Sequence, residues 1–171
     1  MARNIEIKAR VSDLAALEQR VADVADRGPE GLFQDDTFFA CPTGRLKLRD
    51  FGDGRGELIF YQRADQSGPK TSYYQIAPTD EPDALRQVLL EAYGSPGRVV
   101  KQRSLYLAGR TRIHLDRVEG LGEFMELEVV LGKDETADAG LAEARRLMEQ
   151  LGIAPEALIE GAYLDLLGAA D

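Results

Sequence analysis

Strict alternation of apolar and charged residues is the feature that most constrains how this chain folds. In residues 4–11 every second side chain is apolar, and the positions between them are Asn4, Glu6, Lys8 and Arg10. A period of two places successive side chains on opposite faces of an extended strand. Residues 4–11 are therefore predicted to form a strand with one apolar and one charged face.

The same pattern recurs along the chain. It predicts further strands near residues 33–41, 44–51, 56–63, 70–77, 98–108, 110–118 and 123–131. Turn residues at 42–44 and 52–54 favour two hairpins, and residues 64–69 form a polar loop. Helical spacing predicts helices from the N-cap Ser12 to the Gly28-Pro29 stop, and over 81–93, 135–151 and 156–167. The expected fold is an α+β domain with about eight mostly antiparallel strands.

Composition narrows the class of protein. The 171 residues suit a single domain spanning 1–171, and 44% hydrophobic residues suffice for a core. Thirty acidic against 21 basic residues give a net charge of −9, which argues against a nucleic-acid polymer as partner. The lone Cys41, an N-terminus charged from its third residue and the lack of any apolar run near ~20 residues predict a cytoplasmic protein without a membrane segment.

Like charges are placed in phase on several predicted strands. The pairs two residues apart are Lys47/Arg49, Lys101/Arg103 and Arg110/Arg112. On one strand alone, such residues are typical of a solvated face. Repeated over many strands of an acidic protein, they indicate an anion site. A sheet closed into a barrel with this face inward would have a cationic lumen, suited to a compact polyanion.

Carboxylates are also in phase. Glu126 and Glu128 share one face of a predicted strand, and Glu6 lies on the charged face of the first. Beside a phosphate site, such oxygens are typical ligands of Mg²⁺ or Mn²⁺. An exposed acidic strand paired with neighbouring lysines and arginines is the alternative. His114 lies in phase with Arg112 and Asp116, but a lone histidine is more often structural.

Several blocks, taken together, resemble the CYTH family, also called triphosphate tunnel metalloenzymes. Asn-Ile-Glu-Ile-Lys at 4–8 is similar to the Glu-x-Glu-x-Lys opening of that family. The further matching blocks, in order, are residues 44–49, 57–63, 68–72, 100–103, 112–116, 119–128 and 161–167. The family contains class IV adenylyl cyclases, thiamine triphosphatases and inorganic triphosphatases. The resemblance covers nearly the whole chain.

The resemblance implies an eight-stranded antiparallel tunnel that holds a triphosphate lengthwise. It implies metal binding by Glu6, Glu126 and Glu128, with Asp116 assisting the metal or orienting a phosphate-binding cation. It implies substrate binding by Lys8, Lys47, Arg49, Arg63, Lys70, Lys101, Arg103 and Arg112. We expect Glu6, Lys8 and Lys70 to be the catalytic residues, with Lys70 in a loop that could close over the substrate.

One residue departs from the family pattern. Asn4 stands where the opening motif has its first glutamate. A neutral oxygen ligand weakens a metal site or removes one of two metals, so a two-metal mechanism is placed in doubt.

Three functions stay open at this stage. The first is hydrolysis of a phosphoanhydride bond in an inorganic or organic triphosphate, with Mg²⁺ or Mn²⁺ as cofactor. The second is conversion of ATP to cyclic AMP and pyrophosphate by a class IV cyclase. The third is a non-catalytic polyphosphate- or nucleotide-binding module, which Asn4 favours and the Glu126/Glu128 pair opposes. A homodimer is also expected.

Overall fold

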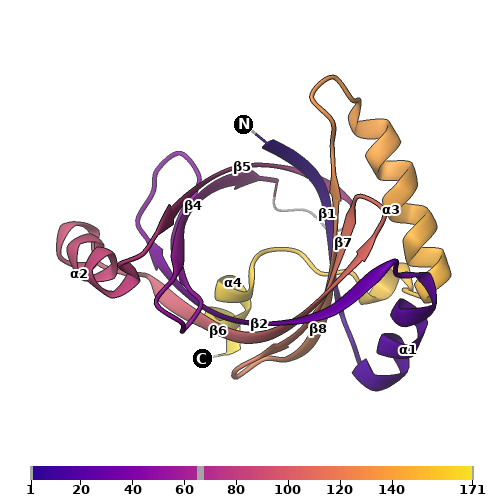
Figure 1. Cartoon of the computed structure of the whole chain (residues 1–171), viewed down its shortest axis with the longest axis horizontal. Helices are drawn as coiled ribbons and strands as arrows, with labels where there is room; N and C mark the ends of the chain where they lie inside the picture. The colour runs from indigo at the N-terminus through magenta and orange to yellow at the C-terminus, as the bar shows by residue number, and fades with distance from the viewer. Residues whose placement is uncertain (1, 65–67, 171) are drawn as a thin grey trace.

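Eight antiparallel strands close into a ring. The computed structural model describes residues 2–64 and 68–170. Within them the strands are β1 (Ala2–Arg10), β2 (Arg27–Phe39), β3 (Arg45–Asp50), β4 (Gly56–Arg63), β5 (Lys70–Thr79), β6 (Gly97–Ala108), β7 (Thr111–Val118) and β8 (Gly122–Val130). They form a closed barrel in the order β1-β5-β4-β3-β2-β6-β7-β8, seen end-on in Figure 1. The predicted α+β fold with an eight-stranded antiparallel barrel is confirmed.

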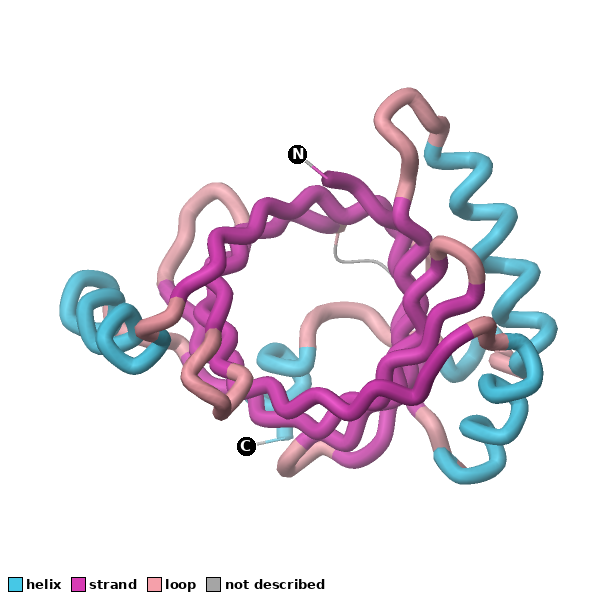
Figure 2. The backbone as a smooth tube through the Cα atoms, in the orientation of Figure 1, coloured by secondary structure: helices cyan, strands magenta, loops and turns pink. Residues whose placement is uncertain are grey.

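Helices flank the ring on two opposite sides. They are α1 (Leu14–Val24), α2 (Pro82–Tyr93), α3 (Ala137–Leu151) and α4 (Tyr163–Ala170). Figure 2 shows α1 and α3 together outside one wall and α2 alone outside the opposite wall. The last helix, α4, and the segment before it lie inside the outline of the ring in this view. Among the described residues, no helix is long and apolar enough to cross a membrane.

The apolar cluster beneath α1 and α3 lies outside the barrel, and this decides where the charges of the neighbouring strands go. Ile7, Ile113 and Leu127 point outward from β1, β7 and β8 and pack with Leu17 of α1 and Leu147 of α3. Because side chains alternate along a strand, burying this face outward directs the polar positions of the same strands into the ring.

The first helix differs from the prediction at both ends. Its N-cap is Asp13, not Ser12, because the Asp13 carboxylate accepts a hydrogen bond from the Ala16 amide. The helix ends at Val24, and Gly28-Pro29 lies within β2. Pairing with β6 decides this: the Asp26 amide donates to the Leu107 carbonyl, and residues from Arg27 onward continue the ladder.

The predicted helix over 156–167 is also wrong. A short 3₁₀ turn at Pro155–Ala157 is followed by extended chain, and α4 begins only at Tyr163. The Ile159 amide donates to the Lys8 carbonyl, and Gly161 has a positive φ of 77°, so this segment cannot be helical. The predicted loop at 64–69 falls partly on residues 65–67, outside the described residues.

Candidate functional site

The barrel encloses a cavity of about 350 Å³ lined by charged side chains. Its cations are Lys8, Lys47, Arg49, Arg63, Lys101, Arg103 and Arg112, and its carboxylates are Glu6, Asp36, Glu57, Glu126 and Glu128. The lining therefore carries seven cations against five carboxylates, although the chain as a whole has a net charge of −9. A cationic excess between low-dielectric walls strengthens attraction for an anion.

Asp36 organises one half of this lining. Its carboxylate, 1% exposed, binds Lys47 Nζ at 2.8 Å, Lys101 Nζ at 3.2 Å, and both Nε and Nη2 of Arg49 at 2.8 Å. Burial alone would raise the pKa of Asp36, but Arg49, Lys101 and Lys47 outweigh it and keep the pKa well below its usual range. One buried carboxylate thus holds three cations, each of which has further N–H donors that could bind another anion.

The two lysines beside Asp36 hold their protons weakly. Burial lowers the pKa of Lys101 to about 7, and the neighbouring Arg49 and Arg103 act in the same direction against the attraction of Asp36. Burial likewise lowers the pKa of Lys47 to about 8. Both lysines therefore change charge near neutral pH.

Arg103 of β6 links the cations around Asp36 to carboxylates of β7 and β8. Its Nε and Nη2 bind Asp116 at 2.6 and 2.7 Å, and Nη2 also binds Glu126 at 2.9 Å. The Tyr163 hydroxyl donates to the same Asp116 at 2.8 Å. Asp116 is fully buried and not part of the cavity lining, which suits the orienting role expected for it rather than direct contact with a metal.

The segment before α4 is attached to the barrel at one end of the cavity. The Gly161 carbonyl accepts hydrogen bonds from Arg63 Nη2 at 3.0 Å and Lys8 Nζ at 3.3 Å. The Lys8 ammonium also lies 4.0 Å from the centre of the Tyr163 ring and 3.3 Å from Glu126. Ala162 and Tyr163 line the cavity at this end. The C-terminal segment is thus part of the site.

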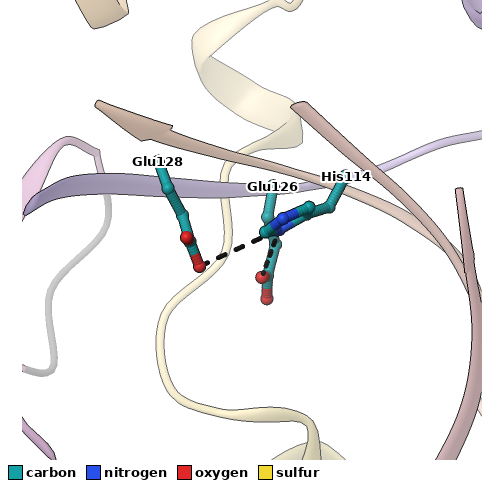
Figure 3. A group of neighbouring side chains, drawn as sticks. All are labelled: His114, Glu126 and Glu128. Carbon is teal, nitrogen blue, oxygen red and sulfur yellow. Dashed lines mark ion pairs between the residues drawn. The ribbon is translucent and has the colours of Figure 1, made fainter. Parts of the chain in front are cut away.

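The acidic half of the wall is formed by Glu6 of β1 and by Glu126 and Glu128 of β8, together with His114 of β7. The strand register places Glu6 opposite Glu128 and His114 opposite Glu126. Figure 3 shows His114, Glu126 and Glu128 pointing toward one another. Their ligand atoms all lie within 4.8 Å of one another, so among the described residues this group is close enough to share one metal ion.

Glu6 is engaged elsewhere. Its carboxylate binds Arg63 Nη1 at 3.1 Å. Burial and the neighbouring Glu128 raise the pKa of Glu6, with Arg63 acting in the opposite direction. Asn4, which is 2% exposed, lines the same cavity, and its buried Oδ1 has no hydrogen-bond partner among the described residues.

Lys70 and Arg112 lie toward the edges of the site. Lys70 is the first residue of β5, paired with Glu6, and is buried instead of standing in an exposed loop. It is not among the residues that line the cavity. Arg112 lines the cavity and binds Glu128 at 3.0 Å through Nε.

The structure thus brings most of the predicted site residues to one cavity. The exceptions are Lys70 and Asp116, which are buried beside it. The pair Arg110/Arg112 does not act together, because Arg110 lies outside β7 and binds Glu135 and Glu143 on the outer surface. The sequence analysis missed Asp36 and gave His114 little weight. The signal for Asp36 was the alternation Gln34, Asp36, Phe38, which continues the inward face of β2.

Comparison with known proteins identifies the family. The model of the CYTH domain matches residues 2–163. A Methanocaldococcus jannaschii protein, MJ0240, whose name proposes it as an adenylate cyclase, is 23% identical, with 96% of this chain and 98% of that protein covered.

Solved structures share the fold at low sequence identity. The PH1012 protein of Pyrococcus horikoshii has a TM-score of 0.85 at 20% identity, over 96% of this chain and 99% of that one. HpAC1 of Hippeastrum, proposed as an adenylyl cyclase and described as having a dominant triphosphatase activity, has a TM-score of 0.70 at 14% identity, over 100% of this chain and 97% of that one. With the family model covering nearly the whole barrel, this chain belongs to the CYTH domain family.

Proposed function

We propose that the protein hydrolyses a phosphoanhydride bond of an inorganic or organic triphosphate bound inside the barrel. The observation that carries the proposal is the excess of cations lining a cavity inside the barrel of an acidic protein. A triphosphate is a compact polyanion, and its three phosphoryl groups can each contact several of these side chains. Arginine forks and lysine ammonium groups are the donors best suited to phosphate oxygens.

The cations around Asp36 would bind the phosphate chain. Lys47, Arg49 and Lys101 are held in place by a buried carboxylate, so little side-chain entropy remains to be lost when an anion binds. Arg63, Arg103 and Arg112 would contact the chain from the other walls. Such pre-positioned charges stabilise the negative charge that spreads over the phosphoryl oxygens in the transition state.

A divalent cation fits the acidic half of the wall. Glu126 and Glu128 would hold it, with Glu6 facing Glu128 across the β1–β8 ladder, and Mg²⁺ or Mn²⁺ is the proposed cofactor. The partnerless oxygen of Asn4 in the same cavity is a further donor that fits a cation. When bound, the ion would neutralise charge on the phosphoryl oxygens. Lys8 would bind the phosphoryl group next to Glu126, and Lys70, beside Glu6 in the ladder, completes the proposed catalytic set of Glu6, Lys8 and Lys70.

A second candidate is a class IV adenylyl cyclase. Apolar side chains, Leu32, Phe51, Ile76 and Leu105, also line the cavity and offer a surface for a nucleoside. The name of MJ0240 points in the same direction, whereas HpAC1 is described as having a dominant triphosphatase activity. In a cyclase the ribose hydroxyl of ATP, instead of water, would attack, and the attacked phosphorus would be the one nearest the ribose.

Product analysis tests the proposal. The purified protein is given Mg²⁺ or Mn²⁺ with tripolyphosphate, thiamine triphosphate or ATP in separate reactions. We expect phosphate release that is lost in Lys8→Ala and retained in Lys133→Ala, a matched change at an exposed lysine outside the cavity. Cyclic AMP with pyrophosphate would overturn hydrolysis in favour of cyclisation.

A binding module without activity is the remaining alternative. Thermal stabilisation by tripolyphosphate without turnover on any substrate would support it, because a ligand that binds only the folded protein raises its stability. Asn4→Glu then separates the cases: a binder that has lost part of a metal site gains turnover, whereas an enzyme changes mainly its metal preference.

A further inference from the structure

His114 is buried inside the barrel without a partner for one of its nitrogens. Its side chain is 6% exposed, and Nδ1 makes no hydrogen bond to any described residue. A buried polar atom without a partner costs about 1–3 kcal/mol, so an unpaired nitrogen in a closely packed barrel calls for a ligand. Carboxylate oxygens of Glu126 and Glu128 lie near this nitrogen.

The distances exclude ordinary hydrogen bonds. Nδ1 lies 3.7 Å from Oε2 of Glu126 and 3.8 Å from Oε1 of Glu128 (Figure 3). Both separations exceed the usual limit for an N–H···O bond. They are compatible with two ligands of one ion, since ligands each about 2.1 Å from a metal lie at most about 4.2 Å apart.

The neighbouring cations bind the two carboxylates at defined oxygens. Arg112 binds Oε2 of Glu128, and Lys8 binds Oε1 of Glu126, whereas Oε1 of Glu128 and Oε2 of Glu126 are the oxygens nearest the imidazole. Arg103 also binds Oε2 of Glu126, at 2.9 Å, so a metal ion would share this oxygen with Arg103.

The other predicted ligands lie outside this group. Glu6 forms an ion pair with Arg63, and Asp116 accepts hydrogen bonds from Arg103 and Tyr163. Neither belongs to the group whose ligand atoms lie within 4.8 Å of one another. Nδ1 of His114 therefore takes the place of a further carboxylate oxygen in the ligand set.

We infer that His114, together with Glu126 and Glu128, binds one divalent transition-metal ion, and that its imidazole makes the site select Mn²⁺ over Mg²⁺. Mg²⁺ prefers oxygen ligands, whereas first-row transition ions bind imidazole more strongly. The use of the bound metal in catalysis rests on the proposed function, whereas the binding of the metal does not. His114 is thereby a direct metal ligand, although a lone histidine in a sequence is more often structural.

The test uses a property of this chain: His114 is its only histidine. Untagged protein is titrated with Mn²⁺ alone, and binding is followed by the electron paramagnetic resonance signal of free Mn²⁺. Pulsed measurements on the bound ion then report any directly coordinated ¹⁴N. We expect nitrogen modulation in the parent protein and its loss in His114→Gln, with Mn²⁺ affinity lowered at least about 10-fold and Mg²⁺ affinity changed much less.

Two further variants keep the result interpretable. Glu126→Gln should also weaken Mn²⁺ binding, whereas Glu57→Gln, which removes a carboxylate of the same cavity outside the proposed ligand set, should leave the nitrogen modulation unchanged. Circular dichroism shows whether each variant is folded. If His114→Gln unfolds, the nitrogen signal of the parent protein alone decides the matter.

Failure of this inference is distinguishable from failure of the proposed function. Mn²⁺ bound without nitrogen modulation, or no Mn²⁺ bound at all, overturns the ligand role of His114. Turnover of tripolyphosphate, measured separately, decides the proposed function. Equal affinity for Mn²⁺ and Mg²⁺ in the parent protein overturns the selectivity.

Discussion

The two halves of the barrel wall carry opposite balances of charge. On β2, β3 and β6, Asp36 alone faces Lys47, Arg49 and Lys101. On β1, β7 and β8, the cavity lining has three carboxylates, Glu6, Glu126 and Glu128, against two cations, Lys8 and Arg112, and it also includes His114. Arg103, on β6, bridges the halves by binding both Asp116 and Glu126. A substrate between these walls would meet phosphate-binding groups on one side and a cation site on the other.

The difference teaches how a barrel can keep many like charges buried. In each half, the charges that are in excess lie within hydrogen-bond distance of a few opposite charges, because an unpaired buried ion costs several kcal/mol. In the cationic half, three cations share the carboxylate of Asp36, whereas the carboxylates of the acidic half form several ion pairs with different cations. Removing Asp36 should therefore do far more damage than removing any one carboxylate of the acidic half.

The largest expected effect is on stability. Asp36→Asn should lower the free energy of unfolding by about 3–5 kcal/mol, because three buried cations lose their shared counter-charge. Urea denaturation measures it, with Asp53→Asn as the control, since Asp53 pairs with Arg55 on the surface. Tripolyphosphate should restore part of the loss. Equal destabilisation by both changes would show that Asp36 does not carry the cationic half.

Substitutions in the two halves should also change different kinetic parameters. Glu126→Gln should lower kcat for the triphosphate by about 100-fold or more, because it weakens the proposed metal site where charge is stabilised in the transition state. Initial rates at saturating substrate measure this. Loss of affinity with unchanged kcat would contradict a catalytic role for the acidic half.

Lys47→Gln should act mainly on binding. Losing one charged donor to a phosphate oxygen should raise KM by about 10-fold or more, with a smaller change in kcat. The same assay resolves the two parameters, and calorimetric titration with tripolyphosphate gives the affinity directly. If Lys47→Gln and Glu126→Gln altered kcat and KM in the same proportion, the assignment of binding to one half and of catalysis to the other would be wrong.

The cationic half should respond to pH near neutrality. Lys101 has a pKa of about 7 in the free protein, lowered by burial and by Arg49, Arg103 and Lys47 against the attraction of Asp36. It is charged below that pH and neutral above it, so anion affinity should fall as pH rises through 7. A bound triphosphate raises the pKa again, and binding at pH 8 should therefore take up a proton.

Calorimetry in buffers of different ionisation enthalpy measures that proton uptake. Lys101→Met should reduce it relative to the parent protein, with the protons of tripolyphosphate itself common to both titrations. Identical uptake by the two proteins would rule out Lys101 as the titrating group.

The last expected effect, a loss of stability smaller than that of Asp36→Asn, concerns the end of the barrel. Tyr163→Phe removes the hydroxyl that donates to Asp116 and keeps the ring that packs on Phe124. The loss should be about 1.5–3 kcal/mol, as for a hydrogen bond to a charged group. Tyr93→Phe, at an exposed ring, is the control in thermal or urea unfolding. A loss no larger than in the control would show that the hydroxyl does not stabilise the attached segment.

Much of the fold and site followed from local pattern. Alternation of apolar and charged residues predicted the strands, and the apolar face of β1, confirmed by the packing of Ile7, implied the inward charged face. The ends of the helices were less predictable. Asp13 and Ser12 are both good N-caps, and only the observed Ala16 hydrogen bond distinguishes them.

The partners of the charges depended on the closed ring. Asp36 lies far from Lys101 in sequence and meets it because β2 pairs with β6. Likewise, Gly161 joins the site because Lys8 and Arg63 reach its carbonyl from two other strands. Such contacts have no periodic signal in a single segment. Alternation along β2 could have placed Asp36 on the inward face, but not its partners, and the last helix was predicted to begin too early.

By itself, the sequence determined which faces of the strands are charged, because side-chain direction follows from the period of two and needs no tertiary contact. It also determined the excess of lysine and arginine at those positions. Only the tertiary structure decided which ions neighbour one another, since register and barrel closure bring together residues more than sixty positions apart, as in Asp36 and Lys101. It likewise turned His114 from an isolated histidine into a neighbour of two carboxylates.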